Sequence, residues 1–150
     1  MIIVSACLCG ENCKYNGGNN DNQKVKDFIK DKEVIYVCPE QMGGLSTPRN
    51  PSEIVGSAKG VLEGRDKIIS NRGVDVSREF ISGAREVLEI AIKNNADLAI
   101  LKAKSPSCGK GLVYDGTFTG SKIVGNGITA QILMDNGVNV INEEELENFW

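Results

Sequence analysis

Histidine is absent from the 150-residue sequence, and this absence excludes several kinds of site. Ser-His-Asp and Cys-His catalysis, every zinc site with a histidine ligand, and the commonest general base near neutral pH are all unavailable. Any acid-base chemistry must therefore use carboxylates, lysine, tyrosine or thiols.

The sequence also lacks an excess of basic residues and any long apolar run. Its 17 Lys and Arg residues against 20 Asp and Glu give a net charge of -3, which argues against a large nucleic acid as partner. No apolar run approaches the roughly 20 residues that span a bilayer, and the first residues, MIIVSACLCG, include no basic leader. We expect a cytoplasmic protein with no membrane-spanning segment. The sequence carries no signal for an oligomeric state.

Four short apolar runs predict the strands of one sheet. Continuous apolar runs without strict alternation are typical of strands buried on both faces. The segments between them show helical periodicity, and the clearest helix has Ser77 as its expected N-cap. The predicted strands are 2–6, 34–37, 98–103 and 138–141, and the predicted helices are 21–30, 77–94 and 128–136, with a last helix beginning after Asn142, which forms a capping box with Glu145.

This alternation predicts an α/β fold: one three-layer, Rossmann-like domain over residues 1–150, with a mainly parallel sheet and right-handed crossovers. The length suits one domain, and 41% apolar residues suffice for a single core. Residues 43–73 are rich in Gly and Pro and are expected to form loops with a short hairpin or extended pieces. Asp115-Gly116 and Asn126-Gly127 predict turns.

Five cysteines are present, and their odd number favours metal or thiol chemistry over a disulfide scaffold. Cys7 directly follows the first predicted strand, Cys38 ends the second, and Cys108 lies shortly after the third. Because the carboxyl ends of parallel strands meet at one edge of a sheet, we expect these three thiols to converge. A single buried cysteine is most often a small hydrophobic residue, but three at equivalent positions favour a shared site.

The arrangement of the thiols also bears on which metal they would hold. Structural zinc takes four ligands, commonly from close cysteine pairs, and only Cys9 and Cys13 come near that pattern. A 4Fe-4S cluster accepts dispersed thiolates, and three of them leave one iron open. Cys13 is then either a fourth ligand or an unligated thiol near the cluster, and Cys9 is an incidental residue of the same turn.

Several motifs, in order along nearly the whole chain, give the sequence a family resemblance. It resembles a family of small bacterial proteins that includes the thiouracil desulfidases. The segments that carry this resemblance are Val4-Ser5-Ala6-Cys7-Leu8, Cys13-Lys14-Tyr15-Asn16-Gly17, Cys38-Pro39-Glu40 with Gly44 and Thr47-Pro48-Arg49, Ile100-Leu101-Lys102 with Ser105-Pro106-Ser107-Cys108-Gly109, and Tyr114-Asp115-Gly116-Thr117-Phe118.

The resemblance implies an enzyme with a 4Fe-4S cluster held by Cys7, Cys38 and Cys108, with one iron not ligated by protein. The implied reaction converts a thiolated pyrimidine, as thiouracil or a thiouridine nucleotide, to the oxo form with release of sulfide and no net electron transfer. The implied catalytic residues are Glu40 and Ser105. An alternative alignment places Met42 at the position of the acid.

Two other functions stay open on the sequence alone. One is an iron-sulfur enzyme that transfers sulfur between carriers, and the other is a non-enzymatic zinc or redox-thiol module built from residues 7–13. Arg49 is a candidate anion-binding residue because Pro48 presents it rigidly. Tyr15 and Tyr114 are candidates for stacking on a pyrimidine ring, and Lys102 and Lys104 for supplying positive charge.

Overall fold

In the computed structural model, which describes residues 1–146, the four predicted strands form one parallel sheet. They are β1 (Ile2–Ser5), β2 (Val34–Val37), β5 (Leu98–Leu101) and β8 (Asn139–Asn142), in the order β2-β1-β5-β8. Every neighbouring pair is parallel, with Ile3 opposite both Ile35 and Ala99. The predicted α/β class with a mainly parallel sheet is therefore confirmed.

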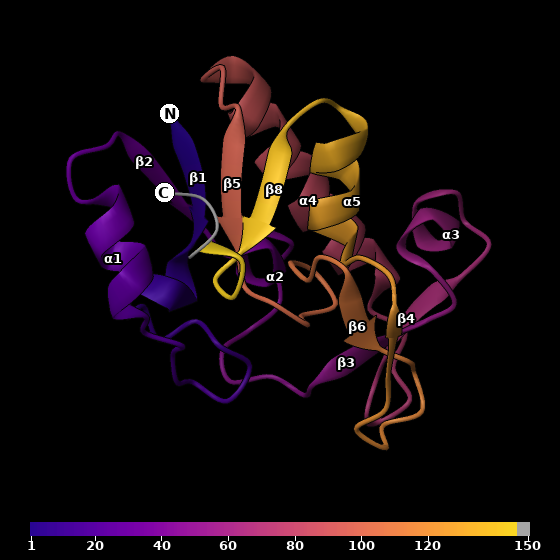
Figure 1. The fold of residues 1–150 in the computed structure, drawn as a ribbon. Coiled ribbons are helices and arrows are strands. Elements are labelled where there is room, and N and C mark those ends of the chain that lie inside the picture. Colours follow the sequence, from indigo (N-terminus) through magenta and orange to yellow (C-terminus); the bar gives the residue numbers. More distant parts are fainter. Residues whose placement is uncertain (147–150) are drawn as a thin grey trace.

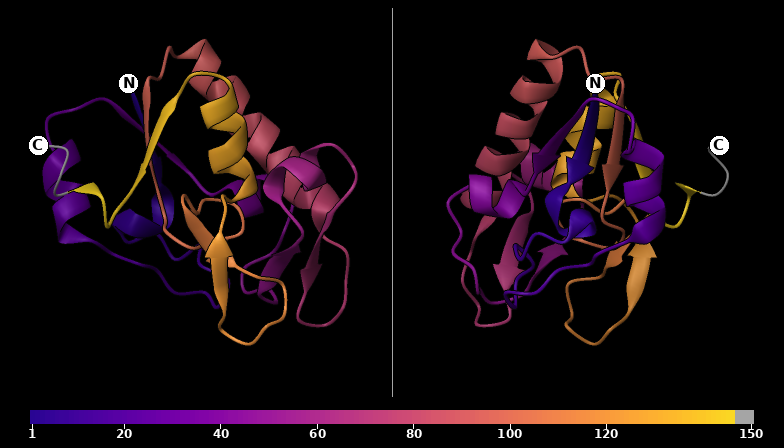
Figure 2. Two further views of the ribbon diagram at one scale, coloured as in Figure 1. Left: turned by 45° about the vertical axis from the view of Figure 1, so that its right-hand side comes forward. Right: turned by 90° about the vertical axis from the view of Figure 1, so that its left-hand side faces the viewer.

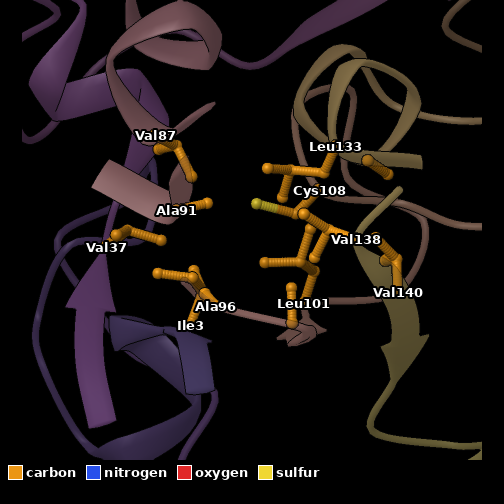
Figure 3. Packing of buried hydrophobic residues seen from close by; sticks show 12 residues of the cluster. Ile3, Val37, Val87, Ala91, Ala96, Leu101, Cys108, Leu133, Val138 and Val140 are labelled. Carbon is orange, nitrogen blue, oxygen red and sulfur yellow. The ribbon is translucent and has the colours of Figure 1, made fainter. Parts of the chain in front are cut away.

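Helices cover both faces of this sheet, which gives the predicted three layers (Figure 1). On one face, α1 (Gln23–Ile29) packs against Ile2 and Val4 of β1. On the other, α4 (Ser77–Lys93) and α5 (Ile128–Asp135) pack against a second cluster that contains Ile3 and Leu101 (Figure 3). Both clusters draw on β1 because successive side chains of a strand point to opposite faces.

Most of the smaller elements lie at or beyond the carboxyl ends of the main strands, while α3 (Ala58–Leu62) lies beside α4 and α5 (Figures 1 and 2). Residues 43–73 include the expected hairpin, and they also contain a short helix that the sequence did not predict. A second antiparallel pair, also unpredicted, follows β5. These elements are η1 (Ala6–Cys9), α2 (Pro39–Met42), β3 (Ser52–Val55), α3 (Ala58–Leu62), β4 (Lys67–Ser70), β6 (Leu112–Tyr114) and β7 (Lys122–Val124), with β3 paired to β4 and β6 to β7.

The structure corrects one predicted helix end, the N-cap of α4. Ser77 is the first residue of α4 and does not act as its N-cap. Its hydroxyl accepts from the backbone N–H of Ile68 at 2.9 Å and donates to Asp75 at 2.6 Å, so it joins the helix to β4. Glu145 and Asn142 do make the reciprocal capping hydrogen bonds. Residues 143–146, where that last helix was predicted to begin, form a turn and no α-helix, and residues 147–150 lie outside the described residues.

Within residues 1–146, none of the helices has both the length and the apolarity that crossing a membrane requires.

Two glycines bring α2 and α4 into backbone contact. A Cβ on Gly43 would lie 1.9 Å from the carbonyl oxygen of Glu79, and one on Gly83 would lie 1.8 Å from that of Pro39. Neither position has room for a side chain, because backbone atoms cannot yield as a flexible side chain would. This contact fixes α2, the turn that directly follows Cys38.

We predict that Gly83→Ala destabilises the protein by about 1–3 kcal/mol, because the added methyl group pushes α2 away from α4. Urea-induced unfolding would measure the loss. Ser82→Ala, on the exposed side of the same helix, is the matched control and is expected to change stability little. Equal effects of the two substitutions would contradict the close contact.

Candidate functional site

The structure brings Cys7, Cys38 and Cys108 together at one cavity. Cys7 lies in η1 after β1, Cys38 precedes α2 at the end of β2, and Cys108 lies in the loop after β5. All three line a cavity of about 470 Å³ at the carboxyl edge of the parallel sheet. This is the convergence that the strand order predicts. All five cysteines of the chain are free thiols.

The loop that carries Cys108 is held by backbone hydrogen bonds to the start of α5. The carbonyls of Pro106 and Ser107 accept from the N–H groups of Ile128 and Thr129 at 3.0 and 2.7 Å. The first N–H groups of a helix have no partner within it, so the loop satisfies them here. Gly127 makes the approach possible, since a Cβ there would lie 2.6 Å from the carbonyl carbon of Ser107.

Within this loop, the Ser105 hydroxyl accepts from the N–H groups of Ser107 and Cys108 at 3.2 and 3.1 Å. Local bonds of this kind are typical of serine in turns. Ser105 therefore shapes the loop as well as facing the cavity, which it lines.

Glu40, Arg49 and Ser107 form a hydrogen-bonded network beside the sulfurs. Arg49 Nε donates to Glu40 Oε1 at 3.0 Å, and the Ser107 hydroxyl donates to Glu40 Oε2 at 2.9 Å. The Ser105 and Ser107 hydroxyl oxygens are 2.9 Å apart, so the chain of contacts runs from Arg49 to Ser105. The side chains of Arg49 and Glu40 are only 7% and 16% exposed.

Cys13 occupies a central place among the thiols. It is buried, lines the same cavity, and interacts with the thiols of both Cys7 and Cys38 closely enough to shift their pKa values. Its carbonyl oxygen accepts from Arg49 Nη2 at 2.9 Å and from the Cys38 thiol at 3.7 Å. Arg49 thus connects the segment that carries Cys13 to the turn that carries Glu40.

The environments of the thiols shift their pKa values in different directions. Hydrogen bonding to Cys13 lowers the pKa of Cys7 and that of Cys38, and hydrogen bonding to these two thiols raises the pKa of Cys13. Burial raises the pKa of Cys108 to about 12. Figure 3 shows the Cys108 sulfur directed toward apolar side chains of the core cluster, which is the physical cause of that shift.

The other residues predicted from the sequence are divided between the cavity and its surroundings. Tyr15, Tyr114, Lys102 and Lys104 all line the cavity. The two lysines are paired with Glu143 and Glu144 at 3.0 and 2.8 Å, so neither is an uncompensated charge.

Two residues lie away from the cavity. Cys9 packs against the cluster beneath α1, and Met42 packs against the core cluster on the opposite face of the sheet. Neither lines the cavity. Of the two positions considered for the acid, 40 and 42, only Glu40 therefore lines the cavity.

Sequence reasoning assigned no role in the site to several residues of the cavity wall, among them Ser5, Asn20, Glu53 and Phe118. The Ser5 hydroxyl accepts from the backbone N–H of Lys102 at 3.0 Å. Ser5 and Phe118 had a usable signal, since each belongs to a motif that carries the family resemblance. Glu53 had none in the sequence alone, because its place depends on two small sheets packing together.

The fold and the site together define a class, an α/β protein of the Rossmann type with a thiol-lined cavity at the carboxyl edge of its sheet. Residues 2–145 match the sequence model of the 2-thiouracil desulfurase family. The chain belongs to this family, which confirms both the predicted family and the predicted enzyme type.

Two individual proteins are similar to this chain over nearly its whole length. The protein YbbK of Bacillus subtilis strain 168, which is uncharacterized, is 45% identical to this chain over 149 residues. The alignment covers 99% of each of the two chains. A solved structure of the [4Fe-4S]-dependent thiouracil desulfidase TudS matches with a TM-score of 0.87 and 34% identity, over 98% of this chain and 93% of that one. This match confirms the Rossmann-like fold.

We predict that Arg49→Met destabilises the protein by about 3 kcal/mol, because it leaves the mostly buried Glu40 carboxylate without its cationic partner. Urea-induced unfolding of the purified protein would measure this loss. Arg65→Met is the matched control, since the Arg65–Glu63 pair is exposed, at 62% and 48%, and such pairs contribute less than about 1 kcal/mol. A double variant, Arg49→Met with Glu40→Gln, should recover part of the loss. Equal losses of stability in Arg49→Met and Arg65→Met would contradict the larger contribution expected of the buried pair.

Proposed function

We propose that this protein uses a 4Fe-4S cluster, held by Cys7, Cys38 and Cys108 with one iron not ligated by protein, to convert a thiolated pyrimidine to its oxo form with release of sulfide. The observation that supports this most is the placement of three thiols from three strand ends at one cavity, with Glu40 and Ser105 in the same wall. The cluster dependence of TudS, whose fold this chain shares, supports the same cofactor here.

The donor set fits a cluster better than a single ion. Within residues 1–146, no group of three His, Cys, Asp or Glu side chains is arranged to hold one metal ion. A four-iron cluster takes thiolates spread around a larger volume, and this requirement is compatible with three cysteines that line one cavity. The thiol of Cys13, placed between two of them, is proposed as an unligated neighbour.

The chain's own residues would carry the proton transfers. When bound, the cluster would supply a thiophilic iron that polarises the C=S bond toward attack at carbon. Glu40 would position a water molecule and accept its proton, and Arg49 and Ser107 would fix both oxygens of the carboxylate for this role. Ser105 would donate a hydrogen bond to the substrate or return the proton. Exchange of C=S for C=O is a hydrolysis, so no electron is gained or lost.

The proposed substrate is a small thiopyrimidine, free or as a nucleotide. Tyr15 and Tyr114 supply aromatic surface in the cavity, and the net charge of -3 gives no attraction for a large nucleic acid. A cytoplasmic location belongs to the proposal, since five free thiols suit a reducing compartment. We also propose that residues 1–150 act as a single domain.

Cluster assembly tests the ligands. After anaerobic reconstitution, wild-type protein should hold about four iron and four sulfide per chain. Cys7→Ser, Cys38→Ser and Cys108→Ser should each lose most of this content and the visible absorption that accompanies it, because each removes one of only three thiolate ligands. Cys9→Ser is the matched control and should keep a full cluster, as should Cys13→Ser. A full cluster in Cys38→Ser or Cys108→Ser would refute the ligand assignment.

Turnover tests the catalytic residues. Anaerobic incubation with 2-thiouracil or thiouridine monophosphate should release sulfide together with the oxo pyrimidine in equal amounts. Glu40→Gln and Ser105→Ala should reduce kcat by about 100-fold or more, because each removes a group that moves a proton, with iron content unchanged. Glu89→Gln, an exposed carboxylate of α4, is the control. Sulfur delivered to a carrier with no free sulfide would instead indicate a transfer enzyme.

A further inference from the structure

The cavity has a second wall that does not come from the main sheet. It is built from β3 and from the loop between β6 and β7, residues 115–121, which lie beyond the carboxyl ends of the parallel strands (Figures 1 and 2). Glu53 of β3 and Phe118 of this loop both line the cavity. Neither has a part in the proposed cluster site or in the network around Glu40.

Glu53 fixes the loop through its backbone. Its Oε1 accepts from the N–H groups of Gly116 and Phe118 at 2.9 and 3.2 Å. Gly116 also approaches β3 directly: its φ is +93°, and a Cβ there would lie 2.8 Å from the carbonyl oxygen of Ile54. The loop is therefore attached to β3 at two successive points, and its position relative to the cavity is defined.

Phe118 is held in an unfavourable backbone conformation. Its φ of +57° lies in the left-handed region, which is unfavourable for a non-glycine residue. Phe118 lines the cavity and is 39% exposed, so burial in the core does not compensate for this cost. The hydrogen bond from the Phe118 N–H to Glu53 stabilises the conformation that keeps the ring at the cavity. Strained residues of this kind commonly occur at binding sites.

Glu53 keeps one free acceptor. Among the described residues, no group hydrogen-bonds to its second oxygen, Oε2, although the side chain lines the cavity and is partly buried. A carboxylate oxygen in this setting accepts strongly from an N–H group. The wall thus combines an aromatic face with one hydrogen-bond acceptor, which are the two features that recognise a flat heterocycle with a ring N–H.

We propose that Glu53 and Phe118 select the ring of the substrate: Phe118 covers its face, and Glu53 Oε2 accepts the N–H that lies between the two carbonyl or thiocarbonyl carbons. This inference rests on the proposed function and specifies its substrate class. A uracil-type ring carries that imide N–H, whether as a base or in a nucleotide. A cytosine-type ring has an unprotonated nitrogen there, whose lone pair faces the carboxylate and is repelled. The site therefore takes thiouracil-type rings and rejects thiocytosine.

Binding of the unreactive oxo bases tests this wall without turnover. Calorimetry on the reconstituted protein should show uracil binding at least tenfold more tightly than cytosine. In Glu53→Gln this ratio should fall about tenfold, because the charge-assisted hydrogen bond to the ring N–H is lost and an amide can pair with either ring. The amide oxygen still accepts from the Gly116 and Phe118 N–H groups, so the loop stays in place. Glu89→Gln is the control, with an unchanged ratio.

Phe118 is tested in the same way. Phe118→Ala should weaken uracil binding about tenfold and raise KM for 2-thiouracil with kcat nearly unchanged, since the substitution removes the aromatic ring on which the base stacks. Phe118→Tyr should restore binding. Val124→Ala, at a position 88% exposed on β7, is the control. Iron content should match the wild type in every variant.

The outcomes separate this inference from the proposed function. Unchanged discrimination in Glu53→Gln, or uracil binding as tight in Phe118→Ala as in the wild type, would overturn the recognition wall even if thiouracil is turned over. Absence of sulfide release by wild-type protein would overturn the proposed reaction, while a uracil preference lost in Glu53→Gln would still support the wall.

Discussion

Parallel pairing of β1, β2 and β5 forces the segments that follow these strands to leave the sheet at one edge. Everything in the candidate site depends on that constraint, because Cys7, Cys38 and Cys108 each belong to one of these segments. Strand direction alone would only bring flexible loops near one another. Backbone contacts with the helices then fix them: Gly43 and Gly83 join the turn after Cys38 to α4, and Gly127 joins the Cys108 loop to α5.

A second constraint is electrostatic. Arg49 contacts the Glu40 carboxylate and the carbonyl oxygen of Cys13, so one guanidinium holds two segments that are far apart in the sequence. A buried ion pair adds little net stability, because removing both charges from water costs nearly as much as their attraction returns. The directional hydrogen bonds of arginine fix geometry instead. Arg49 and Ser107 together leave the Glu40 carboxylate little rotational freedom, which suits its proposed role of orienting a water molecule.

The sequence was sufficient for the main sheet, for α4 and for a hairpin within residues 43–73, but not for the β6–β7 pair. Strands such as Leu98–Leu101 are buried on both faces and show it as unbroken apolar runs. The three-residue strand Lys122–Val124 is exposed throughout, so it has no pattern to detect. Placement of the three cysteines was predictable because it follows from strand direction. The role of Glu53 was not, because a carboxylate that binds backbone N–H groups of a distant loop has the same sequence appearance as one that faces water.

The two walls of the cavity differ in how they are supported. The thiol wall rests on buried strands and on two helices, whose core contacts make local opening costly. The wall of Glu53 and Phe118 rests on two-stranded pairs whose outer side chains, such as Val55 and Val124, are exposed. The buried side chains of the β3–β4 pair, Ile54 and Ile68, belong to a third core cluster, separate from the two that contain residues of β1. The proposed cluster site and the proposed substrate wall therefore rest on different parts of the core. This separation explains why the proposed selectivity resides in residues that no cysteine motif includes.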